Sequence, residues 1–249
     1  MVRFLRQRNR VVGALATPIV FWLLLGSGLD NVFVVSPAGA EGGGAGYLAY
    51  FFPGTLVLIL LFTAVFSTIS VIEDRREGFL QAVLAAPTSR LSIVMGKVLG
   101  GATLATGQGV LFLLLWPWVG PGAGVGTLVL AAAVMLVLAV SLTALGLCIA
   151  WPMDSTAGFH AVMNLVLMPM WFLCGAMFPL GTAPLWVQVL MWVNPLTYGY
   201  TVLAAVLMGE SSPAAAMPVA VALPIMLVLC VLFVALACVV VSRPRAGGV

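Results

Sequence analysis

The chain has 249 residues, of which 63% are hydrophobic and 7% are charged, and its mean hydropathy is +1.22. A soluble domain carries about 25% charged residues, so the composition excludes a soluble enzyme and predicts a polytopic membrane protein. The net charge of +3 does not indicate nucleic-acid binding, because the basic residues stand in three small groups of the kind that determine membrane topology.

The fold class expected from the sequence is all-α, with six transmembrane helices in a single domain that covers residues 1–249. Apolar runs long enough to cross a hydrocarbon core of about 30 Å lie at about 11–29, 47–72, 98–119, 125–150, 158–178 and 219–241. A signal peptide is the alternative for the first run, since Ala38-Gly39-Ala40 resembles a cleavage site. That run is longer than the roughly 7–15 apolar residues of a signal sequence.

The second span carries three hydroxyl residues on one face, because Thr63, Ser67 and Ser70 are spaced at i, i+4 and i+7. Such a face either lines a pathway or mediates close helix packing in lipid, which is the commoner use of small hydroxyl residues. The fifth span contains Pro169, which predicts a break there.

Residues 179–209 are expected to form a hairpin in the outer leaflet rather than a span. Asn194-Pro195 predicts a helix start, with Asn as N-cap and Pro at the first helical position, and Gly209 predicts its end. A helix of this length is about 21 Å long, too short for the membrane core. Its partner helix is expected near 184–193.

Charge predicts the orientation. With six spans, all the Lys and Arg residues fall on one side of the membrane: Arg3, Arg6, Arg8, Arg10, Arg75, Arg76, Arg90, Lys97, Arg243 and Arg245. Cytoplasmic loops carry the excess of basic residues, so both termini are expected in the cytoplasm.

The stretch 73–97 is the only internal segment dense in charge, and it must lie at a membrane surface because a charge at the bilayer centre costs about 2.5–3.5 kcal/mol. Residues 78–86 are expected to form a short amphipathic helix that Pro87 ends, with Thr88 or Ser89 capping the next helix. Its apolar face consists of Phe79, Leu80, Val83 and Leu84, and Glu73, Asp74 and Glu77 precede its N-terminus. A solvated loop with interfacial anchoring is the alternative.

Catalytic candidates are few. His160, the only histidine, lies six residues after Asp154, and the pair either relays protons or consists of ordinary polar residues at a helix end near water. Gly96-Lys97 is not part of a phosphate-binding loop, because the required GxxxxGK[ST] pattern is missing. The four cysteines lie in apolar runs without metal-ligand spacing. No cofactor or metal is expected in this chain.

Two motifs resemble the ABC-2 type permease family, the membrane subunits of ATP-binding-cassette exporters. The first motif consists of Glu77, Gly78, Leu80, Pro87, Ser89, Arg90, Gly96 and Lys97. The second is Asn194-Pro195-Leu196-Thr197-Tyr198 before the last span. Relatives often continue with an acidic residue and an arginine, where this chain has Thr201 and Ala204.

The resemblance implies a multi-pass protein of the cell (inner) membrane that pairs with a second permease chain as a homodimer. Two separate ABC ATPase subunits would bind ATP and Mg²⁺ and drive export. A pathway without charges favours an apolar or amphipathic cargo such as a lipid, glycolipid or drug-like molecule. The alternatives are a membrane-embedded enzyme, which would need groups such as Asp154 and His160 to converge, and a non-transporting assembly factor.

The resemblance also assigns roles to residues of this chain. The helix 77–86 would be the coupling helix seated in an ATPase groove, and the second and fifth spans would line the pathway. The coupling residues are Glu77, Gly78, Phe79, Leu80, Val83, Leu84, Pro87 and Arg90; the pathway residues are Phe62, Phe66, Met163, Met170 and Trp171; the hairpin motif is Asn194, Pro195 and Tyr198. Ordinary packing is the alternative for the pathway residues.

Overall fold

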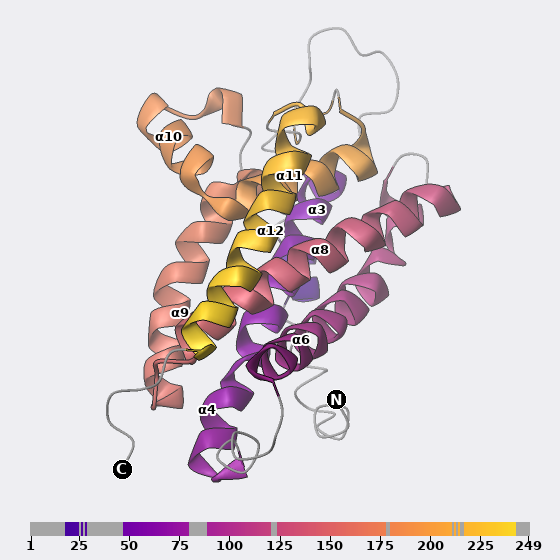
Figure 1. Ribbon diagram of the computed structural model, residues 1–249. Helices are drawn as coiled ribbons and strands as arrows, with labels where there is room; N and C mark the ends of the chain where they lie inside the picture. Colours follow the sequence, from indigo (N-terminus) through magenta and orange to yellow (C-terminus); the bar gives the residue numbers. More distant parts are fainter. Residues whose placement is uncertain are drawn as a thin grey trace, which may run out of the picture.

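The computed structural model is a bundle of helices (Figure 1). It describes residues 18–24, 26, 28, 47–79, 89–120, 124–177, 180–210, 212, 214 and 217–242. No strand occurs among these residues, which agrees with the expected all-α class. The elements are α3 (Tyr47–Ser67), α4 (Ile69–Arg76), α6 (Arg90–Leu113), α7 (Trp116–Val119), α8 (Val125–Ala150), α9 (Thr156–Trp171), the π-helical turn η1 (Phe172–Ala176), the 3₁₀ turn η2 (Leu180–Thr182), α10 (Leu185–Val193), α11 (Pro195–Met208) and α12 (Val219–Ser242).

Five described helical segments are long and apolar enough to cross a membrane, or six if the bent pair α10–α11 is one span. The five are Tyr47–Arg76, Arg90–Val119, Val125–Ala150, Thr156–Ala176 and Val219–Ser242. They are the predicted second to sixth spans. Of the predicted first span, the structure describes a helix over 18–24. Both basic terminal segments lie outside the described residues.

The second span extends further than predicted. α3 ends at Ser67, and after a turn at Thr68 the chain continues as α4 to Arg76. The hydroxyl groups of Ser67 and Thr68 donate to the carbonyls of Ala64 and Val65 at 2.7 and 2.6 Å. Such local bonds compete with the helical hydrogen bonds of the same carbonyls, which accounts for the interruption.

Gly78 has a φ of 76° and ends α4, so the prediction that it belongs to the following amphipathic helix is wrong. The backbone N–H of Gly78 donates to the carbonyl of Arg75, as is typical of a helix that ends at a left-handed glycine. Glu73 and Asp74 therefore lie inside α4 near its C-terminus. The expectation that they precede a helix N-terminus is corrected accordingly.

Three other helix boundaries follow the predicted cap chemistry. The Ser89 hydroxyl accepts a hydrogen bond from the N–H of Ser92 at 3.1 Å and starts α6. The Asn194 side-chain oxygen accepts from the N–H of Leu196 at 3.1 Å and starts α11. Gly209, with a φ of 89°, ends α11. These caps are local, which is why the sequence predicts them correctly.

Two tryptophans stand in the turn after the third span, where tryptophans typically lie at the membrane interface. Trp118 is 80% exposed, as an interfacial residue would be, whereas Trp116 is fully buried. The Trp116 ring packs against Phe52 of α3, with 5.1 Å between ring centroids. The short helix α7 turns Trp116 back onto the bundle, so this residue is part of the core and not of the interface.

Helices α3, α6 and α8 approach closely where small residues meet. A side chain at Gly101 of α6 would clash with Ser67 of α3 and Thr143 of α8, so this position requires glycine. The Thr63 hydroxyl donates to the side-chain oxygen of Gln108 on α6. The hydroxyl face of the second span thus packs against α6, which confirms the packing interpretation and not the pathway one.

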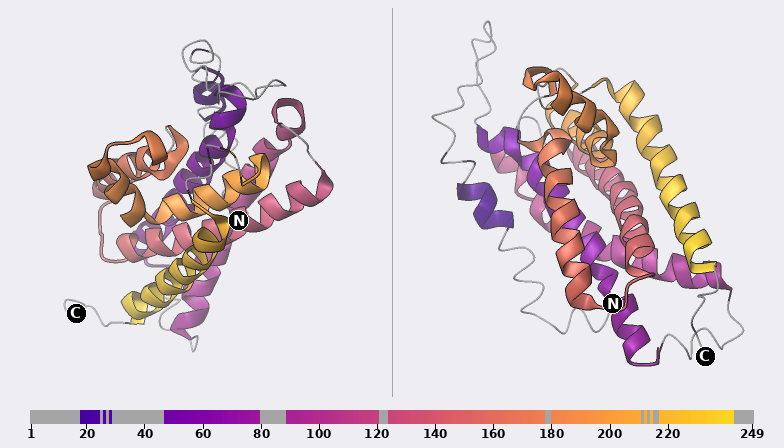
Figure 2. Two further views of the ribbon diagram at one scale, coloured as in Figure 1. Left: turned by 90° about the horizontal axis from the view of Figure 1, so that it is seen from above. Right: turned by 90° about the vertical axis from the view of Figure 1, so that its left-hand side faces the viewer.

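The fifth span does not break where the sequence predicts. α9 continues through Pro169 to Trp171, and the irregular segment is η1, in which Gly175 has a φ of 102°. The π-helix, a rare element, occurs mostly as a single turn inside an α-helix. The last span, α12, runs along the outside of the bundle (Figure 2).

Two helices occupy the region for which the sequence predicts an outer-leaflet hairpin. α10 and α11 meet at an angle of 89°, at the end of the bundle opposite to α4 (Figure 1). α11 is almost wholly buried. α10 is more exposed, with Leu185, Trp186 and Val193 at 80, 69 and 76%.

Candidate functional site

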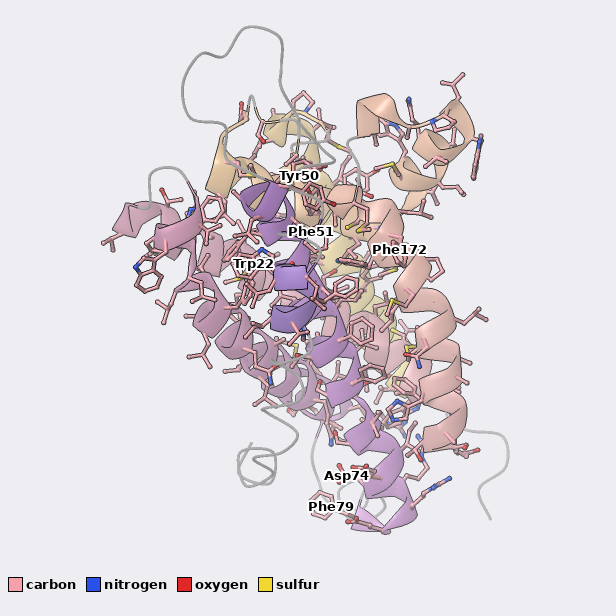
Figure 3. The ribbon with its side chains drawn as sticks, turned by 180° about the vertical axis from the view of Figure 1, so that it is seen from behind. Trp22, Tyr50, Phe51, Asp74, Phe79 and Phe172 are labelled. Carbon is pink, nitrogen blue, oxygen red and sulfur yellow. The ribbon has the colours of Figure 1, made fainter. Side chains whose placement is uncertain are left out.

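Charged side chains of three segments gather at one end of the bundle, beside the end of α12, and we call this region the charged end. It consists of α4, the first turns of α6, the turn 151–155 between α8 and α9, and the end of α12. In Figure 3, Asp74 and Phe79 mark this end, while Tyr50 and Phe51 lie in the opposite half. The contacts described below tie these segments to one another.

Arg75 holds α4 against the turn that follows α8. Its guanidinium group donates to the carbonyl oxygens of Trp151 (2.8 Å) and Met153 (3.0 Å) and to the carboxylate of Asp154 (3.1 Å). It also lies over the Trp151 ring, 5.4 Å from the centroid. Arg76 adds one bond, from Nε to the carbonyl oxygen of Asp154 at 3.0 Å. One arginine therefore fixes the backbone of a turn far away in the sequence.

We expect Arg75→Ala to lower the free energy of unfolding by about 2–3 kcal/mol, because two carbonyl groups lose charge-assisted hydrogen bonds. The ion pair itself contributes little, since the Asp154 side chain is 79% exposed. Arg76→Ala is the matched control and should cost less than about 1 kcal/mol. Thermal unfolding in detergent compares the two variants; equal losses would contradict the role of Arg75.

A second contact joins α4 to α6. The Lys97 ammonium group donates to the carboxylate of Asp74 and, at 3.2 Å, to the hydroxyl of Ser70. Both charged side chains are largely covered, at 29 and 18% exposed. The ion pair joins α4 and α6, the two helices that flank the segment 77–89. It therefore fixes the distance between the two ends of that segment.

Arg90 binds the end of the last span. Its Nη1 donates to the carbonyl oxygens of Val241 (3.0 Å) and Ser242 (3.2 Å), the last residues of α12. A cation at this position also complements the partial negative charge of a helix C-terminus. The structure thus gives Arg90 a contact within its own chain, whereas the family resemblance assigns it to coupling.

The residues assigned to coupling are only partly described. Glu77 and Gly78 form the C-terminal cap of α4, and the Phe79 side chain is 59% exposed. Leu80, Val83, Leu84 and Pro87 lie outside the described residues. Of the expected apolar face, the described residues include Phe79 alone, so that face stays a prediction.

The residues assigned to the pathway separate into two groups. Met163 and Trp171 are buried inside this chain, and the Trp171 indole N–H donates to the carbonyl oxygen of Gly54 at 2.8 Å. Phe62 and Phe66 are half-buried neighbours with 5.5 Å between ring centroids. Met170 is also half-buried. In this conformation Met163 and Trp171 hold α9 to α3.

The hairpin motif binds the irregular segment of the fifth span. The Asn194 amide donates to the carbonyl oxygen of Met170 at 2.6 Å, and the Thr197 hydroxyl donates to that of Leu173 at 3.3 Å. The Tyr198 hydroxyl donates to the carbonyl oxygen of Trp192 at 2.6 Å, which closes the bend between α10 and α11. Pro195 supplies the first helical position of α11.

Tyr50 of α3 also binds the irregular segment of the fifth span, since its hydroxyl donates to the carbonyl oxygen of Gly175 at 3.3 Å. Carbonyl groups at a helix interruption lack their regular partners, and these side chains supply them. Tyr50 was not among the candidate residues expected from the sequence, and Thr197 was named only as a member of the motif 194–198. Arg75 was not a candidate either, although opposite charges in two loops expected on one side of the membrane were a usable signal for its contact with Asp154.

Sequence comparisons relate the chain to a family of membrane proteins. Residues 1–208 match the profile of the family described as "ABC-2 type transporter". A putative transport permease, ycf38, of Cyanophora paradoxa is 26% identical over 200 residues, which cover 79% of this chain and 67% of the relative. Nodulation protein J of Rhizobium leguminosarum bv. viciae is 26% identical over 206 residues, covering 80 and 75%. The probable multidrug ABC transporter permease YbhR of Escherichia coli (strain K12) is 24% identical over 132 residues, which cover 53% of this chain and 36% of the relative.

Proposed function

The chain belongs to the ABC-2 type transporter family and is thus a multi-pass membrane permease of an ABC transporter; from this premise we propose that it exports an apolar or amphipathic substrate from the cytoplasm. ATP and Mg²⁺ bind to a separate ATPase subunit, and two permease chains form the transporter. The substrate class includes lipids, glycolipids and drug-like molecules.

The charged end is the proposed ATPase-docking surface. The observation that carries this proposal is the set of contacts around the segment 77–89, which link α4, α6, the 151–155 turn and α12. A force on the coupling segment would therefore move the ends of several spans together. Because the ATPase lies in the cytoplasm, its docking surface at the charged end lies on the cytoplasmic side as well. This orientation agrees with the rule that loops rich in Lys and Arg are cytoplasmic.

The proposed pathway lies between the face of α3 that carries Phe62 and Phe66 and the face of α9 that carries His160. The Phe66 ring lies 5.0 Å from the imidazole of His160, so aromatic groups of both helices share this face. No charged side chain occurs in α3 or α9. A small ion would lack compensating charge there, which supports an apolar or amphipathic substrate. The inner membrane of a cell is the proposed location.

The test is reconstitution with the candidate ATPase. We expect the two subunits to purify together, and we expect the complex in liposomes to hydrolyse ATP and move a fluorescent lipid. The permease alone should neither bind nor hydrolyse ATP, because the sequence has no phosphate-binding loop. A complex with an ATPase variant that cannot hydrolyse ATP is the control. Specific nucleotide binding by the isolated permease would overturn this division of labour.

A further inference from the structure

Helix α4 is separated from its own span by the turn at Thr68. Helices kink where side chains interrupt their hydrogen bonds, and the hydroxyl of Thr68 binds the carbonyl of Val65 at this point. The direction of α4 therefore depends on what α4 packs against. Its neighbours at the charged end decide how it is placed below α3.

The apolar contact between α4 and α6 belongs to a small core at the charged end. Val71 of α4 and Val94 and Val98 of α6 are fully buried members of one cluster. The same cluster includes buried residues from α8, the turn after it and α12, namely Ala144, Leu147, Trp151, Ala237 and Val241. Apolar burial is non-directional. This packing brings α4 to α6 but does not set the rotation of α4 about its axis.

The polar contact beside this packing is directional. Ser70 and Asp74 are four residues apart and lie on one face of α4, and the Lys97 ammonium group donates to both side chains. Lys97 stands eight residues after the N-cap Ser89, about 12 Å along α6. One ammonium group thus binds two positions of α4 that are one turn apart. It fixes the rotation and the register of α4 against α6.

Both charged groups of this contact are largely covered by their own chain, with 18% of the Asp74 side chain and 29% of the Lys97 side chain exposed. A docked ATPase would gain little surface from either group. Covered charges are also screened by salt less than exposed ones. A role of this pair in transport would therefore act through the positions of α4 and α6 rather than through contact with a partner.

We infer that the Asp74–Lys97 pair is a positioning contact that couples ATP hydrolysis to transport. It keeps α4 and α6 in one register, so that a displacement of the docking surface moves both helices together. The inference rests on the proposed docking of the ATPase at the charged end and names the residues that transmit its movement. Without the pair, the ATPase still docks and hydrolyses ATP, but α4 moves without α6.

A charge reversal in the isolated permease tests the contact without any ATPase. Asp74→Lys and Lys97→Asp each place two like charges together and should lower the apparent unfolding temperature in detergent by about 2–4 °C. The double variant restores an opposite-charge pair, so it should recover about half or more of the summed loss. If the losses of the two single variants simply add in the double variant, the inference is overturned.

Coupling is measured in liposomes that contain the permease and the ATPase, as the number of lipid molecules moved per ATP hydrolysed. Asp74→Asn and Lys97→Met each remove one charge with little change in shape. Both should lower this ratio at least about fivefold, the lower end of the usual coupling between two sites, while co-purification and ATP hydrolysis stay close to those of the unsubstituted complex. The reversed pair should regain most of the ratio. Glu210→Gln, which removes a carboxylate after α11, is the control and should leave the ratio unchanged.

The ratio separates positioning from mere stabilisation of the fold. If the pair only stabilises the permease, hydrolysis and transport fall together in Asp74→Asn and Lys97→Met, their ratio stays constant, and the inference fails. A working complex in which both variants keep the ratio removes the inference alone. If the unsubstituted chain forms no complex with the ATPase, the proposed function fails and the inference fails with it.

Discussion

Replacing Trp171 with alanine is expected to lower the free energy of unfolding by about 3–5 kcal/mol, the usual range for a buried Trp or Phe truncated to alanine. The Trp171 side chain is 1% exposed and its ring lies 5.9 Å from those of both Phe21 and Phe51. The substitution would also leave the carbonyl of Gly54 without the indole donor. The segment from 18 to 24, α3 and the end of α9 all lose contacts at once.

The measurement is the apparent unfolding temperature in detergent, which should fall by roughly 6–20 °C for a chain of this size. Trp118→Ala is the matched control, because that side chain is 80% exposed and should shift the midpoint little. Trp171→Phe keeps most of the packing but lacks the N–H, so its unfolding temperature should lie between those of Trp171→Ala and Trp118→Ala. A shift for Trp171→Ala no larger than that of Trp118→Ala would mean that α9 is not held through this residue.

Replacing both Leu80 and Val83 with aspartate is expected to abolish co-purification of the ATPase while the permease still inserts into the membrane. Each apolar side chain loses burial worth about 1.5–3 kcal/mol, and each new carboxylate would be unpaired in an apolar groove. The loss of affinity should therefore exceed about 100-fold. Pull-down with a tagged ATPase and transport in liposomes measure the effect.

The control places two aspartates on the other face of the same predicted helix, at Ala82 and Ala85. These positions are about 130° and 170° from the centre of the apolar face at 100° per residue, so this variant should keep the ATPase bound. If the apolar face only anchors the segment to the bilayer surface, both double variants will retain the ATPase, and the coupling role of Leu80 and Val83 is lost.

The sequence by itself determined which segments are helical and where several of them end. Apolar length predicted α8 and α12 to within one residue of their ends, because a span must match the thickness of the bilayer. Ser89, Asn194 and Gly209 were correctly predicted as caps, since a cap depends on a few neighbouring residues. The family resemblance could also be recognised from the sequence alone, because its motifs lie in contiguous stretches.

The tertiary structure alone decided which face of each helix is covered and where distant side chains bond. Arg75 and Arg90 bind carbonyl groups 76 and 151 residues away, at Trp151 and Val241, and no local pattern encodes such pairs. Trp116 is buried because α7 turns it onto Phe52. Nearly every residue of a membrane span is apolar, so hydropathy cannot distinguish a lipid-facing side from a packed one.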